Sequence, residues 1–199
     1  AVYRMLDRYP RRDVLSFRSP RDATDEELRW VHTSEHLERV KSTAAVDHYR
    51  FDLDTAANRH SEAAARRAAG AVISAVEAVD ADSAVALVRP PGHHAERHQA
   101  MGFCLFNNVA VAAEYARRVL SLSRVAIFDW AVHHGNGTQH SFYDRDDVLY
   151  ASIHQAPFYP GTGSVEETGA GAGAGYTVNM PLDPGSGDSE YLYLMDGVL

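Results

Sequence analysis

The sequence has one cysteine, no long apolar run and no excess of basic residues, and each shortage excludes a class of protein. Cys104 has no second cysteine to pair with, so we expect no internal disulfide and a reducing, cytoplasmic setting. No apolar stretch approaches the length of a membrane span, and the charged N-terminal residues contain no signal-peptide core. With a formal net charge of −8, neither nucleic acid nor a membrane is an expected partner.

The apolar pattern of the 199 residues predicts a single α/β domain spanning 1–199. Thr24 and Glu27 form a capping box for a short helix, Ser61 precedes an alanine-rich helix over 62–79, and Asn107 or Asn108 caps another. Between the helices, buried strands are predicted near 84–88, 125–129, 148–152 and 176–180. This alternation indicates a parallel, doubly wound sheet flanked by helices.

One polar segment directly follows the predicted strand 125–129. It reads Asp-Trp-Ala-Val-His-His-Gly-Asn-Gly-Thr-Gln over residues 129–139. Ligands of open α/β sheets bind at such strand ends. Alternation along an extended chain sends Asp129, Ala131 and His133 to the same side. A carboxylate, a methyl group and an imidazole therefore share one wall, which has the form of a metal site that lacks one ligand.

A second histidine pair, His93 and His94, follows the predicted strand 84–88 in the segment Arg-Pro-Pro-Gly-His-His. A lone histidine in a loop is more often structural than functional. Two adjacent pairs, each placed just after a strand, are difficult to explain by packing alone. They indicate a site that uses imidazoles for proton transfer or metal binding.

Three segments, residues 89–108, 129–139 and 152–163, together resemble the zinc-dependent histone deacetylase superfamily. The likeness is greatest to its bacterial class II-like and acetoin-utilisation-type members, with acetylpolyamine amidohydrolases related, and it runs from about Asp22 to Leu199. The resemblance implies an arginase–deacetylase fold. It also implies hydrolysis of an N-acetyl amide, with an acetyl-lysine peptide or an acetylated polyamine as the substrate.

The resemblance assigns roles to residues of both histidine pairs. It implies that His93 and His94 handle protons and that His94 is the base that activates water. Asp129 would orient His93, and Asn136 stands at the position of the partner of His94. His133 matches the imidazole ligand of the zinc ion.

Position 131 is where the family places an aspartate zinc ligand, and a methyl group cannot coordinate a metal. His133 is then the one zinc ligand left, whereas a catalytic zinc needs about three protein ligands. We therefore expect zinc to bind weakly or not at all and this chain to be inactive. Ala131 is either a substitution introduced to silence an enzyme or a natural feature of a degenerate relative, and the close match of the surrounding residues favours the former.

The resemblance also implies a potassium site beneath the zinc loop. Its ligands would be Asp129, Ser152 and the backbone carbonyls of residues 131, 133 and 153. A backbone carbonyl does not depend on its side chain, so Ala131 is expected to leave most of this site intact.

The same likeness places Gly102, Phe103 and Tyr159 in the walls of a narrow tunnel that admits the acylated amine. Two facing aromatic rings form an apolar slot for a methylene chain. Phe158 is expected in the core rather than in the tunnel. Cys104 is expected to be buried and inert, because it sits in an apolar run without an activating partner.

Some polar residues are expected to be structural. Asp52 and Asp54, near the substrate entrance of the resembled family, are interpreted as part of a solvated loop. His98, His140 and His154 match no functional position of the resembled family, so structural roles are expected for them.

Proteins of the resembled family continue beyond the position of Leu199, and their later segments supply a further aspartate ligand and a tyrosine. The sequence is therefore expected to be incomplete at its C-terminus. Two other functions stay open: a non-catalytic deacetylase-like binding domain, and a hydrolase of an unrelated small amide. The physiological substrate and the oligomeric state, a homo-oligomer included, are not determined by the sequence.

Overall fold

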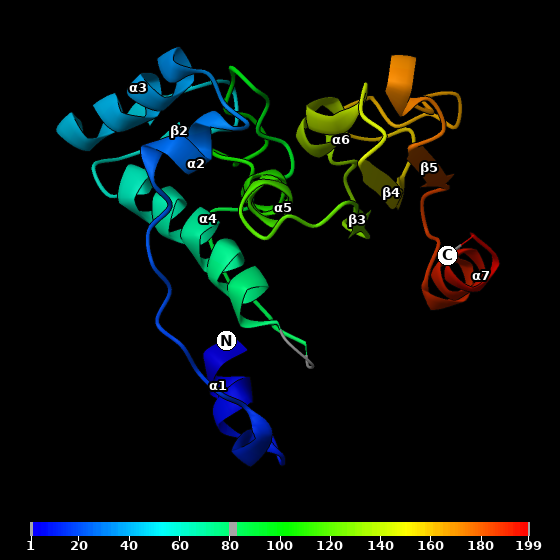
Figure 1. Ribbon diagram of the computed structural model, residues 1–199, viewed down its shortest axis with the longest axis horizontal. Helices are drawn as coiled ribbons and strands as arrows, with labels where there is room; N and C mark the ends of the chain where they lie inside the picture. The colour runs from blue at the N-terminus through cyan, green and yellow to red at the C-terminus, as the bar shows by residue number, and fades with distance from the viewer. Residues whose placement is uncertain (1, 80–82, 199) are drawn as a thin grey trace.

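The computed structural model describes residues 2–79 and 83–198 (Figure 1). The helices are α1 (Val2–Asp7), α2 (Asp25–Arg29), α3 (Ser34–Ser42), α4 (Ser61–Ala78), α5 (Asn108–Arg118), α6 (Asn136–Phe142) and α7 (Asp188–Val198). The strands are β1 (Tyr49–Arg50), β2 (Ala56–Ala57), β3 (Val125–Asp129), β4 (Val148–Gln155) and β5 (Thr177–Leu182). Single 3-10 turns occur at Arg12–Val14, Thr43–Ala45 and Gly171–Gly173.

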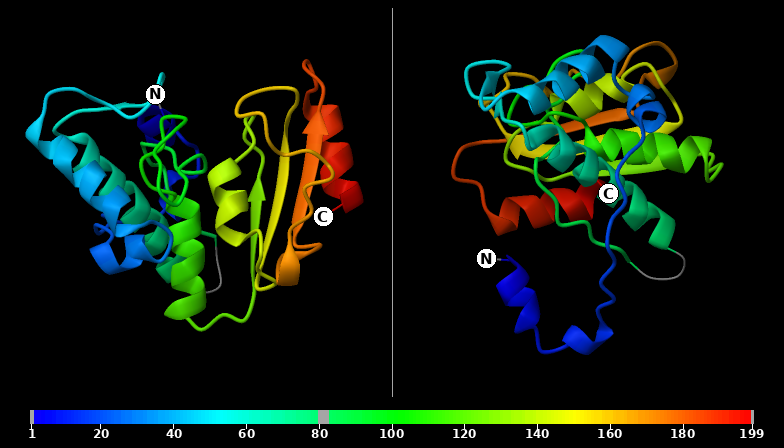
Figure 2. Two further views of the ribbon diagram at one scale, coloured as in Figure 1. Left: turned by 90° about the horizontal axis from the view of Figure 1, so that it is seen from above. Right: turned by 90° about the vertical axis from the view of Figure 1, so that its left-hand side faces the viewer.

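A parallel sheet in the order β3-β4-β5 forms the centre of the fold. Its two faces are covered by different helices, with α6 on one side and α7 on the other (Figure 2). Alternation along β4 explains this arrangement: Tyr150 joins the larger core with α4 and α5, whereas Ala151 and Ile153 pack with Met180 against α7. The prediction of a doubly wound parallel sheet is thus confirmed for these three strands.

The predicted strand at 84–88 is wrong. Residues 83–88 lie in no ladder, and the side chains of Val85 and Leu87 are 79% and 46% exposed. A strand needs a neighbour to satisfy its backbone N–H and C=O groups, and within residues 2–79 and 83–198 no other segment pairs with this one. The apolar run has the composition of a strand, but an apolar pattern does not show whether a neighbouring strand is available to pair with it.

The predicted helix starts are correct in two of three cases. Thr24 and Glu27 form the capping box of α2, and the Asn107 side chain accepts a hydrogen bond from the backbone of Ala110 at the start of α5. Ser61 is instead the first residue of α4, and its hydroxyl accepts from the backbone of Asn58. It stabilises the turn before the helix rather than the helix end.

The small residues of α4 allow neighbouring chain segments to approach closely. Ala65, Ala69 and Ile73 are buried against the core, and a methyl group at Gly70 would overlap the backbone at Arg21. The chain preceding α2 therefore crosses directly over α4. Side chains larger than alanine would separate the two segments.

Two buried histidines at the start of the fold hold the loop that precedes α5. His32 accepts a hydrogen bond from the backbone N–H of Asn107 at Nε2, so its Nδ1–H donates to the carbonyl of Glu96, 2.9 Å away in each case. One turn later, His36 donates from Nε2 to the carbonyl of Leu105 at 2.8 Å. These bonds fix both ends of the segment 96–107.

Among the described residues, no helix is both long enough and apolar enough to cross a membrane.

The burial of His32 predicts that acid destabilises the fold. Burial, and then the nearby His36, lowers the pKa of His32 from 6.5 to about 3. Between these values the unfolded chain binds a proton that the folded chain does not, so the free energy of unfolding falls as the pH decreases. From pH 7 to 5 this single group accounts for about 2 kcal/mol.

Urea unfolding at pH 7 and pH 5 measures this effect. The difference in stability between the two pH values should shrink in His32→Gln and stay unchanged in the control His48→Gln, whose side chain is exposed. An unaltered difference in His32→Gln would show that another group controls the acid response.

Candidate active site

The predicted site residues converge at the C-terminal end of the parallel sheet. Asp129 is the last residue of β3, and the loop that follows carries His133 before α6 begins. His93 and His94 come from the loop ahead of α5, and Tyr159 comes from the loop after β4. Parallel strands place their carboxyl ends at one edge, which brings the loops after β3 and β4 together, and the loop ahead of α5 meets them there.

Asp129 orients His93. The Asp129 Oδ2 atom lies 2.8 Å from His93 Nδ1, and because a carboxylate only accepts, the imidazole carries its proton on Nδ1. The backbone N–H of Ala131 donates to Oδ1 at 3.0 Å, and the Tyr150 hydroxyl lies 3.4 Å from Oδ2. Burial alone would raise the pKa of Asp129, but the bond to His93 and these other donors hold it below its ordinary value.

The hydrogen-bond partner of His94 is an amide, whereas that of His93 is a carboxylate. Its Nδ1 atom lies 2.8 Å from Asn136 Oδ1, so Nδ1 donates and Nε2 keeps its lone pair. Burial, followed by the neighbouring His93, lowers the pKa of His94 to about 4. The imidazole is therefore neutral at neutral pH, which is the form that accepts a proton.

His133 lies between two aromatic rings. The Phe158 ring stacks on it at a centroid distance of 4.8 Å, and the Tyr159 ring meets it edge-on at 5.6 Å. Tyr159 also meets His94 edge-on at 5.0 Å. The imidazoles and the tyrosine thus border a common space.

The other wall of this space is a tight turn at Gly102 and Phe103. Both residues have positive φ, 56° and 64°, and the Phe103 backbone N–H donates to the Thr55 hydroxyl at 3.1 Å. The Phe103 ring is 61% exposed. Burial raises the pKa of Tyr159 to about 12, and the carboxylates of Asp54 and Asp52 add to this, which places negative charge near the tyrosine.

Beneath the histidines, a buried polar layer supports the loop that carries them. The Ser152 hydroxyl is 2.9 Å from His154 Nδ1, and His154 Nε2 is 2.9 Å from the carbonyl of Gly163. His134 contacts the Thr162 hydroxyl at 2.7 Å. Gly163 has φ of 90°, and a methyl group there would lie 2.6 Å from both His134 and His154. Glycine is required at this contact.

The side chains present do not fit a tightly held zinc ion. Position 131 offers a methyl group, and within the described part of the chain no three His, Cys, Asp or Glu side chains form a metal-ligating group. His133 is the one residue that the sequence resemblance assigns to the zinc. A monovalent cation would need oxygen ligands instead. Asp129 and Ser152 both carry side-chain oxygens and are register partners on β3 and β4.

Comparison with known proteins identifies this arrangement. The family model described as the histone deacetylase domain matches residues 1–199. The chain belongs to the histone deacetylase family. It is 46% identical to histone deacetylase 15 of Arabidopsis thaliana over 188 residues, covering 90% of this chain and 34% of that protein. It is 44% identical to a histone deacetylase-like amidohydrolase of Pseudomonas aeruginosa, covering 93% of this chain and 50% of that protein.

A solved structure agrees with the sequence comparison. The crystal structure of the HDA15 HD domain superposes with a TM-score of 0.86 at 45% identity, covering 90% of this chain and 53% of that one. The expected arginase–deacetylase fold is thereby supported. The chain spans between 28% and 56% of the length of these curated relatives.

The candidate site contains one residue, Phe158, for which the prediction of a core position is wrong. Phe158 is 48% exposed and stacks on His133. Cys104 is buried as expected, and burial raises the pKa of its thiol to about 12, so the thiol is inert. The Asp52 carboxylate accepts from the backbone of Asp54 and Thr55, a structural role within its turn.

Sequence reasoning missed three residues that support the site. Thr55 holds the Phe103 turn, Tyr150 reaches Asp129 from β4, and Glu96 contacts Asn136. Glu96 follows His94 by two positions, a spacing that was visible but carries no motif by itself. Thr55 and Tyr150 are distant in sequence from their partners, and no local signal identifies them.

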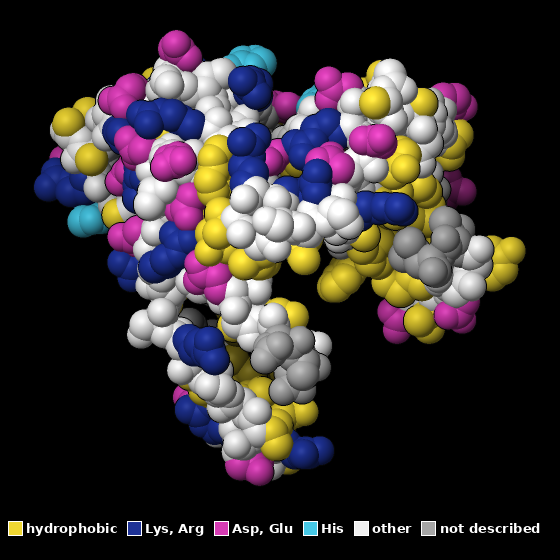
Figure 3. Space-filling model, in the orientation of Figure 1, with side chains coloured by type: hydrophobic (Ala, Val, Ile, Leu, Met, Phe, Trp, Pro, Cys, Tyr) yellow, Lys and Arg dark blue, Asp and Glu magenta, His cyan; other side chains and the backbone are white. Residues whose placement is uncertain are grey.

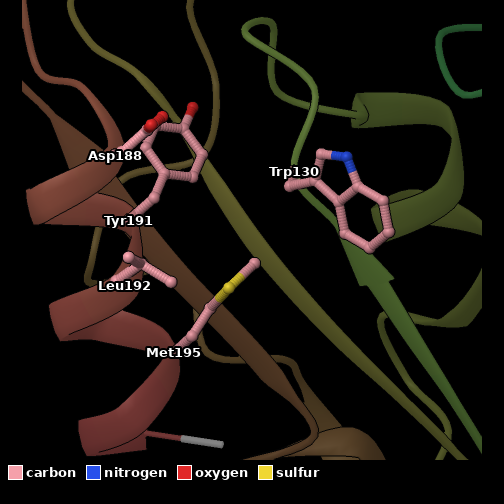
Figure 4. Close-up of a pocket in the computed structure, with 5 residues that line it drawn as sticks. All are labelled: Trp130, Asp188, Tyr191, Leu192 and Met195. Carbon is pink, nitrogen blue, oxygen red and sulfur yellow. The ribbon is translucent and has the colours of Figure 1, made fainter.

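Two hollows lie outside the site. An apolar one of about 370 Å³ separates Trp130 from α7, lined by Tyr191, Leu192 and Met195 with Asp188 at one end (Figure 4). A polar one of about 360 Å³ includes Glu96, Arg97 and His140. The face shown in Figure 3 carries basic and acidic side chains intermixed rather than in a patch of one sign.

We expect Gly102→Ala to damage both stability and the site. A methyl group at this position would overlap the His94 ring, in addition to the cost of positive φ, which is about 1–2 kcal/mol. Gly161→Ala is the matched control, because Gly161 also has positive φ but no atom within 4 Å of the added methyl. Urea unfolding should show a larger loss for Gly102→Ala, and equal losses would mean that His94 moves aside without cost.

Proposed function

We propose that this chain carries the proton-handling and acyl-binding part of a deacetylase site, and that it binds an acylated amine without hydrolysing it. The observation that supports this most directly is the cluster of His93, His94 and His133, beside an alanine at position 131 where the resembled family has an aspartate. The reaction of the family to which this site corresponds is hydrolysis of an N-acetyl amide.

His94 is proposed as the base. It is neutral at neutral pH, and its bond to Asn136 leaves Nε2 as the nitrogen with a lone pair. A water molecule within reach of that nitrogen would lose its proton to it as the water attacks the acetyl carbonyl. His93 is adjacent to His94 and is held by Asp129, and we propose that it handles the proton of the leaving amine.

The aromatic side chains are proposed to receive the acyl-bearing methylene chain. Phe103 stands exposed on one side, and Tyr159 borders the histidines on the other. Negative charge from Asp52 and Asp54 near Tyr159 favours substrates that carry a positive charge close to the amide. An acetyl-lysine peptide and an acetylated polyamine both meet this description.

Ala131 is the observation that favours a binding domain, and the alternative function is that of an active deacetylase. Hydrolysis and binding are separable by experiment. Acetyl-lysine peptide bound with unchanged mass after prolonged incubation supports the binding domain. Release of acetate above the level of a His94→Ala control supports an enzyme and contradicts our proposal.

Restoring the carboxylate in Ala131→Asp is expected to increase zinc affinity by about tenfold, which corresponds to about 1.4 kcal/mol. The new side chain adds a second ligand beside His133, while three are needed for a catalytic site, so turnover should remain undetectable. Titration calorimetry with zinc measures the change. Ala131→Asn, of equal size but without charge, is the control, and equal affinities for the two variants would show that position 131 is not a ligand position.

We also propose that a potassium ion binds beside Asp129 and Ser152. Binding to the folded state alone would add about 1.4 kcal/mol at an ion concentration about tenfold above its dissociation constant. Thermal unfolding should therefore occur at a higher temperature in potassium chloride than in sodium chloride at the same ionic strength. Ser152→Ala should reduce the difference, and identical melting temperatures of the parent chain in both salts would contradict the site.

A further inference from the structure

The partner of His94 is an amide whose two ends are chemically different. An asparagine presents either its oxygen, which accepts, or its NH₂, which donates. If Oδ1 faces His94 Nδ1, the imidazole proton stays on Nδ1 and Nε2 is free to accept. If the amide were reversed, Nδ1 would have to accept and the proton would move to Nε2. The orientation of Asn136 thus decides which tautomer His94 adopts.

Glu96 contacts the other end of the same amide. Asn136 Nδ2 donates to Glu96 Oε1, while Asn136 Oδ1 lies 2.8 Å from His94 Nδ1. An ionised carboxylate has no donor, so the end of the amide that faces it must be the NH₂ group. Asn136 is buried, which makes an unmatched contact at either end costly.

His140 holds Glu96 in this position and keeps it ionised. His140 Nδ1 lies 2.8 Å from Glu96 Oε1, the same oxygen that Asn136 contacts, and His140 is half exposed at the polar hollow. Burial by itself would raise the pKa of Glu96, but the bonds from His140 and Asn136 hold it below its ordinary value. Glu96 is therefore a fixed acceptor at neutral pH.

Other acceptors near the Asn136 NH₂ group are weaker. The carbonyl of His94 lies 3.4 Å from Nδ2 and the Met101 sulfur lies 3.5 Å away. The carbonyl lies near the limit of a hydrogen bond, a thioether sulfur is a weak acceptor, and neither group carries a full charge. Glu96 is the one charged group among the contacts of this amide.

We propose that Glu96 is a positioning residue that fixes the Asn136 amide and thereby holds His94 in the tautomer with its proton on Nδ1. The assignment of His94 as a base rests on the proposed function. The tautomer does not, because it is a property of the folded chain without metal, substrate or turnover.

Replacing the acceptor by a donor tests the proposal. In Glu96→Lys the amide should reverse its ends, and His94 should change from mainly Nδ1–H to mainly Nε2–H. Long-range proton–nitrogen correlation spectra of the ¹⁵N-labelled full chain report the tautomer, with the His94 signals assigned by their loss in His94→Gln. Glu96→Gln retains one acceptor oxygen and should keep the Nδ1–H form.

A second substitution provides the rescue. An aspartate at 136 has an acceptor at both ends, so Glu96→Lys combined with Asn136→Asp should return His94 to the Nδ1–H form. Glu62→Lys is the matched control, because the side chains of Glu62 and Glu96 are 18% and 17% exposed and Glu62 is also held by an ion pair. This control should leave the His94 signals unchanged.

Persistence of the Nδ1–H form in Glu96→Lys would overturn the proposal, as would failure of the folded double variant to restore that form. If Glu96→Lys does not fold, the proposal is tested on the unsubstituted chain by NMR. One Asn136 side-chain amide proton should then be shifted downfield and protected from exchange by its bond to the carboxylate, and an unshifted, exchanging proton would refute the proposal. Absence of hydrolysis affects only the proposed function.

Discussion

The carboxylate of Asp129 occupies the end of β3, and the surrounding structure is arranged to keep it charged while buried. It accepts from His93, from the backbone of Ala131 and from the hydroxyl of Tyr150. A methyl group at Gly135 would overlap this carboxylate, so the loop after β3 can close over it only with glycine. A buried charge without such partners would be neutralised or would unfold its surroundings.

The adjacent histidines His93 and His94 are held by chemically different partners. His93 faces a carboxylate, which accepts at both oxygens and therefore fixes the tautomer without help. His94 faces an amide, which fixes a tautomer only if its own orientation is fixed from behind. Glu96 and His140 provide a charged contact at that place. With an amide partner, the tautomer of His94 therefore depends on more residues than the tautomer of His93 does.

Ala131 separates the contributions of side chains and backbone. Its N–H donates to Asp129, and this contact does not depend on the side chain at position 131. The side chain itself is a methyl group, which has no lone pair to offer a metal ion. The site thus has histidines and aromatic walls, while the part of the chain that the structure describes contains no group of three side chains that could ligate a metal, the number a catalytic zinc needs.

The sequence by itself determined the local features: the capping box of α2, the Asn107 cap of α5, three strands and the segments by which the family is recognised. Each depends on residues close together in the chain, where periodicity and hydrogen-bonding groups act directly. The residues named for the site also came from these segments, and the fold brings them together. Their chemical roles remain proposals.

Only the tertiary structure decided the contacts that depend on distant segments. The apolar run at 84–88 has the composition of a strand, but pairing requires a neighbour that a pattern cannot supply. Phe158 has the composition of a core residue, but in the structure it stacks on His133. Likewise Thr55, Tyr150 and Glu96 acquire meaning only from the partners that folding places beside them. Hydrogen bonds and burial are properties of neighbours in space, and the order of residues in a chain does not state which neighbours those are.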